Sequence, residues 1–235
     1  MRNSNALSKL FPVISISRGF MSRRLHIVAT SGFAKETAQL ADAICRVTPY
    51  WDEIVYISED KAEAGRKMSF GVVAGTDELL ISASEPIDVA IGIGVPSIRR
   101  RVAQKLQQYP HLRFPNLIHP KVTIDLNWIH LGVGNLITAG CVLTCDLEIG
   151  DFNVFNLNVT VGHDACIGSY NVFNPGCNLS GNVQIGNECL AGTGSQMLEK
   201  VRLASRCMLG AGAVLTKSCD VEGAVLIGVP ARPRA

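Results

Sequence analysis

The residues best suited to chemistry in this 235-residue chain are Gly162-His163-Asp164. An outward-facing imidazole beside a carboxylate can accept a proton near neutral pH, because the ordinary pKa of histidine is about 6.5. Such a histidine is suited to act as general base for an attacking amine or hydroxyl. The alternative is a surface histidine at a corner of the chain, without a chemical role. The surrounding elements must decide between these readings.

A six-residue period fills the second half of the chain. Every sixth residue from Leu131 to Val221 gives sixteen positions, of which fifteen are large and apolar, and many are followed by glycine or asparagine. Neither a lone helix nor an alternating hairpin has this period, whereas a coil of three short strands and three tight corners does. The repeat predicts a parallel β-helix with eighteen residues per coil. Its phase suggests no insertion and no projecting loop between these two residues.

The same register assigns most of the cysteines to packing. Five fall on the small inward position, namely Cys141, Cys177, Cys189, Cys207 and Cys219. Cys189 and Cys207 lie one coil apart, but no secretory signal indicates an oxidising compartment. No Cys-x-x-Cys or histidine set with zinc spacing occurs, so we expect no metal site.

His163 occupies the third position of its hexad and therefore avoids the interior. Stacking by eighteen residues places Cys145, Gly181 and Glu199 in its column, and we expect Gly181 to leave an open slot for a thin ligand. Because a coil with a filled interior has no deep pocket of its own, the site should form between adjacent prisms. A homotrimer suits a three-sided prism.

The first half alternates strands and helices. We expect strands at 25–29, 53–57 and 89–93, helices at 34–47 and 97–108, and a short apolar run at 117–118. This order predicts a small parallel, Rossmann-like α/β sheet, whose ligands lie beyond the carboxyl ends of the strands. Those ends carry Ser31-Gly32-Phe33, Ser58-Glu59-Asp60 and Gly94-Val95. Ordinary tight turns remain an alternative interpretation.

Composition narrows the class of protein. The net charge of +2 and 18% charged residues do not match the basic footprint of a nucleic-acid binder. Arg99-Arg100-Arg101 is read as a solvated helix face. The apolar run at 10–16 is too short and broken to span a membrane. We expect a disordered leader at 1–24, an α/β domain at 25–115, a β-helix domain at 116–235, and a cytoplasmic location.

Over residues 25–232 the chain resembles the NeuD/PglD family of bacterial sugar acyltransferases. The motifs that carry the resemblance occur in the family's order and spacing. They are Ser31-Gly32-Phe33-Ala34-Lys35-Glu36, Ile93-Gly94 to Ile98-Arg99, Leu117-Ile118-His119-Pro120, Val161-Gly162-His163-Asp164, Asn174-Pro175-Gly176, Ser180-Gly181-Asn182-Val183 and Gly228-Val229-Pro230-Ala231.

The resemblance implies a left-handed, trimeric β-helix that binds acetyl-CoA between neighbouring prisms, and an N-terminal domain that holds a sugar or nucleotide-sugar substrate. His163 would be the general base and Asp164 would fix its tautomer. The implied substrate contacts are Ser31, Gly32, Phe33, Ser58, Glu59, Gly94 and Asn156. The implied coenzyme contacts are Val172, Gly181, Gly192, Thr193, Gly210, Ala211 and Gly212.

Three departures from the family pattern fall on the sugar side, at Phe33, Ser58-Glu59 and Val95. We therefore expect an acetyl-CoA-dependent sugar N- or O-acetyltransferase of surface-glycan precursor synthesis, with an acceptor that can differ from the 4-amino sugars of the PglD branch. The alternative is a non-catalytic nucleotide-sugar-binding or scaffold protein that kept the prism. A β-helix carbonic anhydrase is disfavoured because the necessary histidine set is missing.

Overall fold

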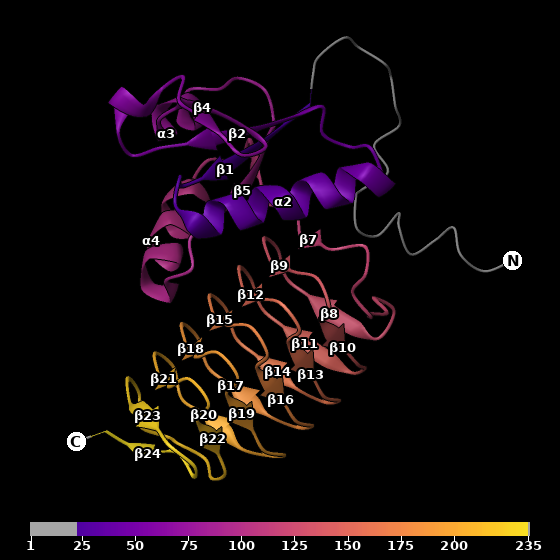
Figure 1. Ribbon diagram of the computed structural model, residues 1–235, viewed down its shortest axis with the longest axis vertical. Coiled ribbons are helices and arrows are strands. Elements are labelled where there is room, and N and C mark those ends of the chain that lie inside the picture. Colours follow the sequence, from indigo (N-terminus) through magenta and orange to yellow (C-terminus); the bar gives the residue numbers. More distant parts are fainter. Residues whose placement is uncertain (1–22, 235) are drawn as a thin grey trace, which may run out of the picture. The chain divides into compact units, whose positions relative to one another are not determined.

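The computed structural model describes residues 23–234, which fold into two compact units (Figure 1). The first unit comprises residues 23–93 and 101–120, and the second comprises residues 94–100 and 121–234. Residues 94–100, which lie in the sequence between two parts of the first unit, thus belong to the second unit. Most of the expected leader, residues 1–22, lies outside the described residues.

The first unit is built on a six-stranded sheet of order β3-β4-β2-β1-β5-β6. Its elements are β1 (Arg24–Val28), α2 (Gly32–Val47), β2 (Glu53–Ile57), η1 (Lys61–Glu63), β3 (Lys67–Met68), β4 (Gly71–Gly75), α3 (Asp77–Ile81), β5 (Ile87–Ile91), α4 (Pro96–Leu106), β6 (Leu112–Arg113) and β7 (Leu117–Ile118). The sheet is mixed, because β3 pairs antiparallel with β4 while the other pairs are parallel. The sequence reading missed β4 and α3 and expected a purely parallel sheet.

Helix α2 packs closely because small residues form its buried face. Ala34, Ala38 and Ala41 are fully buried, as apolar residues at helical spacing should be. A β-carbon at Gly92, just after β5, would lie 2.8 Å from the α-carbon of Ala34. This close approach fixes the start of the helix near the carboxyl ends of the strands.

The second unit is a parallel β-helix with three faces, as the period predicts (Figure 1). The β12 face contains β9 (Leu136–Ile137), β12 (Val154–Phe155), β15 (Val172–Phe173), β18 (Leu190–Ala191), β21 (Met208–Leu209), β23 (Val225–Ile227) and β24 (Arg232–Pro233). The β13 face contains β10 (Val142–Leu143), β13 (Thr160–Val161), β16 (Asn178–Leu179), β19 (Gln196–Met197) and β22 (Val214–Leu215). The β14 face contains β8 (Ile129–Leu131), β11 (Leu147–Ile149), β14 (Cys166–Ile167), β17 (Gln184–Ile185) and β20 (Arg202–Leu203).

The interior follows the predicted register over most of the prism. Residues pair with the residue eighteen positions later, as in Phe155 with Phe173, whose rings stack with centroids 5.1 Å apart. Four of the five cysteines assigned to the small inward position are buried, and only Cys219 is partly exposed. All eight cysteines are free thiols. The four buried cysteines pack the interior of the prism.

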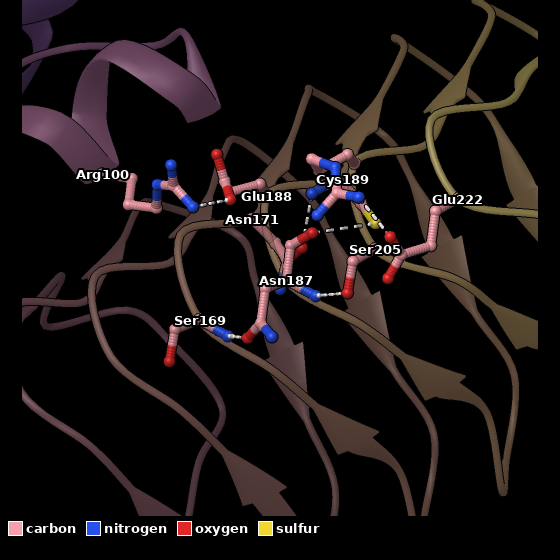
Figure 2. A network of polar contacts seen from close by, with 9 residues as sticks. Arg100, Ser169, Asn171, Asn187, Glu188, Cys189, Ser205 and Glu222 are labelled. Carbon is pink, nitrogen blue, oxygen red and sulfur yellow. Dashed lines mark hydrogen bonds and ion pairs between the residues drawn. The ribbon is translucent and has the colours of Figure 1, made fainter.

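Side-chain ladders link successive coils at the corner between the β14 and β12 faces (Figure 2). Within the buried ladder, the backbone N–H groups of Asn171 and Cys189 donate to the side-chain oxygens of Asn153 and Asn171, at 2.9 and 2.7 Å. In the outer ladder, the N–H of Ser169 donates to Oδ1 of Asn187 at 2.7 Å. These bonds satisfy corner N–H groups that the strand pairing leaves without partners.

Residues 94–100 bind to the corner between the β14 and β12 faces through two arginine side chains. Arg99 is fully buried, and its guanidinium donates to the carbonyl of Phe152 at 2.6 Å and to that of Gly134 at 3.2 Å. Burial lowers the pKa of Arg99 to about 9. Arg100 pairs with Glu188 at 2.7 Å (Figure 2). The reading of Arg99-Arg100-Arg101 as a solvated helix face is therefore wrong for Arg99.

The eighteen-residue phase ends after Leu215. Leu203 pairs with Cys219, sixteen residues later, and Leu209 pairs with Leu226, seventeen residues later. Val221, expected inside, is 68% exposed, and Leu226 is buried in its place. The expectation of an unbroken phase to Val221 is thus wrong, because the turn after Leu215 is shorter than one regular coil requires.

Candidate active site

His163 and Asp164 form a coupled pair at the corner that joins the β13 and β14 faces. Nδ1 of His163 lies 2.6 Å from Oδ2 of Asp164, and both side chains are slightly more than half exposed. Since a carboxylate only accepts, Nδ1 carries the hydrogen and Nε2 keeps its lone pair. Asp164 adopts a left-handed backbone conformation with φ of 56°, which aspartate tolerates well at a tight corner.

The imidazole of His163 lies over Gly181 of the next coil. A β-carbon on Gly181 would lie 2.6 Å from Nε2, 2.7 Å from Cε1 and 3.1 Å from Cδ2. The space above Gly181 is therefore filled by the imidazole instead of being the open slot that we expected. Glycine at this position leaves room for the ring.

The predicted coenzyme residues lie at a different corner, between the β12 and β13 faces. Gly192 and Thr193 follow β18, and Gly210, Ala211 and Gly212 follow β21 on the next coil. A β-carbon on Gly192 would lie 2.5 Å from the nitrogen of Ala211, so the coils approach closely here. Within one chain, this corner and the corner of His163 stand at opposite ends of the β13 face.

Two further predicted residues are only partly available. The side chain of Val172 is 2% exposed, so the described chain offers little of it to a coenzyme. Asn156 precedes β13 whereas His163 follows it, and Oδ1 of Asn156 already accepts the N–H of Leu157 at 2.8 Å. The chain does not bring Asn156 and His163 together by itself.

The expected substrate residues of the first unit border a cavity of about 680 Å³. Ser31, Ser58 and Glu59 line it, whereas Gly32 and Phe33 do not. Gly94 belongs to the second unit. The cavity lies beyond the carboxyl ends of β1 and β2, where ligands of parallel sheets bind.

Sequence reasoning missed Glu63, which also lines this cavity. Its carboxylate accepts hydrogen bonds from Ser58 and from Thr30, and thereby joins the ends of β2 and β1. Glu63 stands three residues after Asp60, which caps the short helix η1 by accepting the N–H of Ala62. This Asp-x-x-Glu spacing is the signal that could have drawn attention to Glu63.

Known proteins resemble both units of the chain. Residues 24–106 match the model of the PglD N-terminal domain family. The acetyltransferase domain of PglB from Neisseria gonorrhoeae FA1090 is 29% identical, with 91% of this chain and 100% of that chain covered and a TM-score of 0.83. The same domain has also been solved with acetyl coenzyme A. The resemblance to the PglD/NeuD-type sugar acetyltransferases is confirmed.

Two other members of this structural group support the fold. WeeI from Acinetobacter baumannii AYE is 25% identical, with 91% and 100% of the two chains covered and a TM-score of 0.79. A perosamine N-acetyltransferase mutant from Caulobacter crescentus, solved with CoA and GDP-perosamine, is 23% identical, with 92% and 98% covered and a TM-score of 0.81. None of the curated proteins matches the chain. The predicted PglD/NeuD-type architecture, an α/β domain followed by a left-handed β-helix, is thus confirmed, and the PglB domain supports the predicted acyltransferase class.

Two features are missing from residues 23–234. No group of three or more His, Cys, Asp or Glu side chains there is arranged to hold a metal ion. None of the helices in this range combines the length and the apolar character needed to cross a membrane.

Proposed function

We propose that this chain transfers the acetyl group of acetyl-CoA to an amino or hydroxyl group of a nucleotide-linked sugar, with His163 as general base. The observation that carries the proposal is the short contact between Nδ1 of His163 and Asp164, which leaves Nε2 as a proton acceptor. As the acceptor atom attacks the thioester carbonyl, Nε2 takes its proton; the C–S bond then breaks, and the proton passes from Nε2 to the departing sulfur, so that CoA leaves as a thiol. A positioned base of this kind contributes a factor of about 10² to 10⁴ in rate.

The backbone supplies a candidate for stabilising the oxyanion of that attack. The N–H of Gly181 donates no hydrogen bond to any residue between 23 and 234. A β-carbon on Gly162 would lie 2.6 Å from this nitrogen, so glycine at 162 keeps its surroundings open. An uncommitted N–H beside the base can stabilise charge that develops on the thioester oxygen. We assign this role to Gly181 in place of a slot for the coenzyme.

We propose that two copies of the chain complete each site. Since the β13 face separates His163 from Gly192, Thr193 and Ala211, one chain cannot present the base and these coenzyme residues to one ligand. A neighbouring prism that brings its β12–β13 corner to the β13–β14 corner of the first would join them. Three copies around a threefold axis form three such sites, as cyclic symmetry requires.

The acceptor is assigned to the cavity of the first unit. Its volume of about 680 Å³ lies within the usual range for small-molecule sites. We also place the protein in the cytoplasm, because eight free thiols suit a reducing compartment.

A mixing experiment tests the shared site. His163→Ala and Ala211→Trp are each expected to lower the rate of CoA release from acetyl-CoA, in the presence of an amino-sugar nucleotide, by about a hundredfold or more. Random co-assembly of the two variants should restore about one quarter of the parent rate, because one site in each mixed trimer then has both parts intact. If the mixture stayed as inactive as its components although mixed oligomers formed, the shared site would be wrong. A His163→Ala variant with the parent rate would refute the base.

A further inference from the structure

The cavity of the first unit has two walls of different chemistry. The wall formed by the ends of β1 and β2 and by η1 carries hydroxyls and carboxylates, from Thr30, Ser58, Glu59, Asp60 and Glu63. The wall formed by α4 carries cations and apolar side chains, from Arg101, Val102, Lys105 and Leu106. A ligand with two chemically different ends would therefore fit the cavity in one direction better than in the other.

Glu63 determines which hydrogen-bonding groups face the cavity from the wall formed by the ends of β1 and β2 and by η1. Oε2 of Glu63 accepts from Oγ of Ser58 at 2.6 Å and from Oγ1 of Thr30 at 3.0 Å. Arg66 pairs with Oε1 at 2.9 Å. The pKa of Glu63 lies below its ordinary value, mainly because of the hydrogen bond from Ser58, so the group is a carboxylate at neutral pH.

These bonds use the only hydrogen of each hydroxyl. Because Ser58 and Thr30 donate to Glu63, their oxygens can only accept from anything else. Oγ of Ser58 also receives the N–H of Asp60 at 3.1 Å, and Ser58 is more than nine-tenths buried. Around Glu63 the side chains therefore present acceptors: lone pairs of Thr30 and the carboxylates of Glu59, Asp60 and Glu63, whereas the hydroxyl of Ser31, which also lines the cavity, can still donate. A ligand group that faces Glu63 must bring O–H or N–H donors.

The opposite wall suits an anion. Arg101 and Lys105 are one helical turn apart on α4, and both side chains are exposed. Lys105 forms an ion pair with Asp77 of α3, which also lines the cavity. A diphosphate that entered the cavity could replace Asp77 as the partner of Lys105 and bind Arg101 at the same time.

We propose that Glu63 sets the direction in which a nucleotide-linked sugar binds, with donors of the nucleoside toward Glu63 and the diphosphate toward Arg101 and Lys105. The nucleoside donors are the ribose hydroxyls and the N–H groups of the base. Glu63 is thus a specificity-determining residue of this site. The inference rests on the proposed function, because it assumes that the acceptor sugar is carried on a nucleotide.

The test compares Glu63→Gln with Glu78→Gln in the full-length chain. Glu78 has the same side chain and an exposed ion pair with Lys61, but it does not line the cavity. Calorimetry with UDP, GDP, CDP and dTDP should identify the preferred diphosphate of the parent. Glu63→Gln should weaken its binding on the order of tenfold, because hydrogen bonds to a charged group are lost, and should leave inorganic pyrophosphate unaffected. Lys105→Ala should weaken both probes, and Glu78→Gln should change neither.

The outcomes separate the inference from the proposed function. If Glu63→Gln left the preferred diphosphate unaffected, or weakened pyrophosphate equally, the assigned direction would be wrong while the acetyl transfer stood. If the parent bound none of the four diphosphates, both the proposal of a nucleotide-linked acceptor and this inference would be wrong. In turnover, Glu63→Gln should raise the KM for the sugar nucleotide and leave kcat and the KM for acetyl-CoA unchanged. An equal fall in kcat would indicate that Glu63 acts on the reaction itself.

Discussion

The imidazole of His163 occupies the space that a β-carbon on Gly181, one coil further along the prism, would need, because that carbon would lie 2.6 Å from Nε2. The base is therefore held from two directions, by Asp164 at Nδ1 and by the backbone of the next coil beneath the ring. Side chains of one coil and backbone of the next thus form the candidate centre together.

Gly181→Ala should displace the imidazole and lower kcat on the order of tenfold to a hundredfold, because a small misplacement of a catalytic group is costly. The free energy of unfolding should change by much less than the activation free energy that corresponds to the loss in kcat. A cycle with His163→Ala checks the cause: Gly181→Ala should have no further effect on the rate once the imidazole is gone. An equal loss of rate in both backgrounds would show that the glycine acts independently of the histidine.

Asp164→Asn should lower kcat by about 10² or more, because an amide can orient either nitrogen of the ring and does not stabilise the protonated imidazole. Asp146→Asn is the matched control. It occupies the same position one coil earlier and has nearly the same backbone conformation, with φ of 55°. Steady-state rates of CoA release should separate the two variants, and similar losses in both would contradict the assigned role of Asp164.

Asn171→Ala should cost about 1–3 kcal/mol of unfolding free energy, because the buried N–H of Cys189 then has no acceptor. Asn187→Ala removes a similar bond, from the N–H of Ser169, at an exposed corner where water can replace it (Figure 2). Urea unfolding of the two variants should show the larger loss for Asn171. Equal losses would mean that burial does not decide the strength of these ladders.

The stability of the first unit should fall in mild acid because of His26. Burial lowers the pKa of this histidine below 6.5, and its Nδ1 has no hydrogen-bond partner among the described residues. Since the unfolded chain binds the proton more readily, the contribution of His26 is fully present above pH 6.5 and is lost as pH falls through its lower folded pKa. His26→Gln should flatten the decline in unfolding free energy between neutral and mildly acidic pH, as measured by urea unfolding at a series of pH values; an unchanged decline would contradict the role of His26.

The sequence predicted the prism well because its core repeats. From Leu131 to Leu215 each inward position has the same neighbours one coil above and below, so a period of six residues identifies the interior directly. The end of the prism could not be predicted in this way. The pairing of Leu203 with Cys219 depends on the length of one turn, to which hydrophobic spacing is insensitive.

The candidate site was less predictable than the fold. His163 and Asp164 are neighbours in sequence, so their pairing could be anticipated. The contact between His163 and Gly181 was anticipated only as a shared column, because stacking gives the position of a residue and not the direction of its ring. Glu63 escaped notice because its importance arises from Thr30, which lies 33 residues away and meets it only in the folded chain.

The shortened final coil also changes the strand edge that the β-helix presents at its end. A solenoid that ends in phase displays N–H and C=O groups at the spacing of one more coil, a template on which further chains can add. Here the chain falls out of step after Leu215, and β24 turns back to pair antiparallel with β23, ending at Arg232–Pro233. Proline has no N–H to donate, and arginine brings charge to the edge. The strand that ends the β-helix is therefore a poor template for the addition of a further coil.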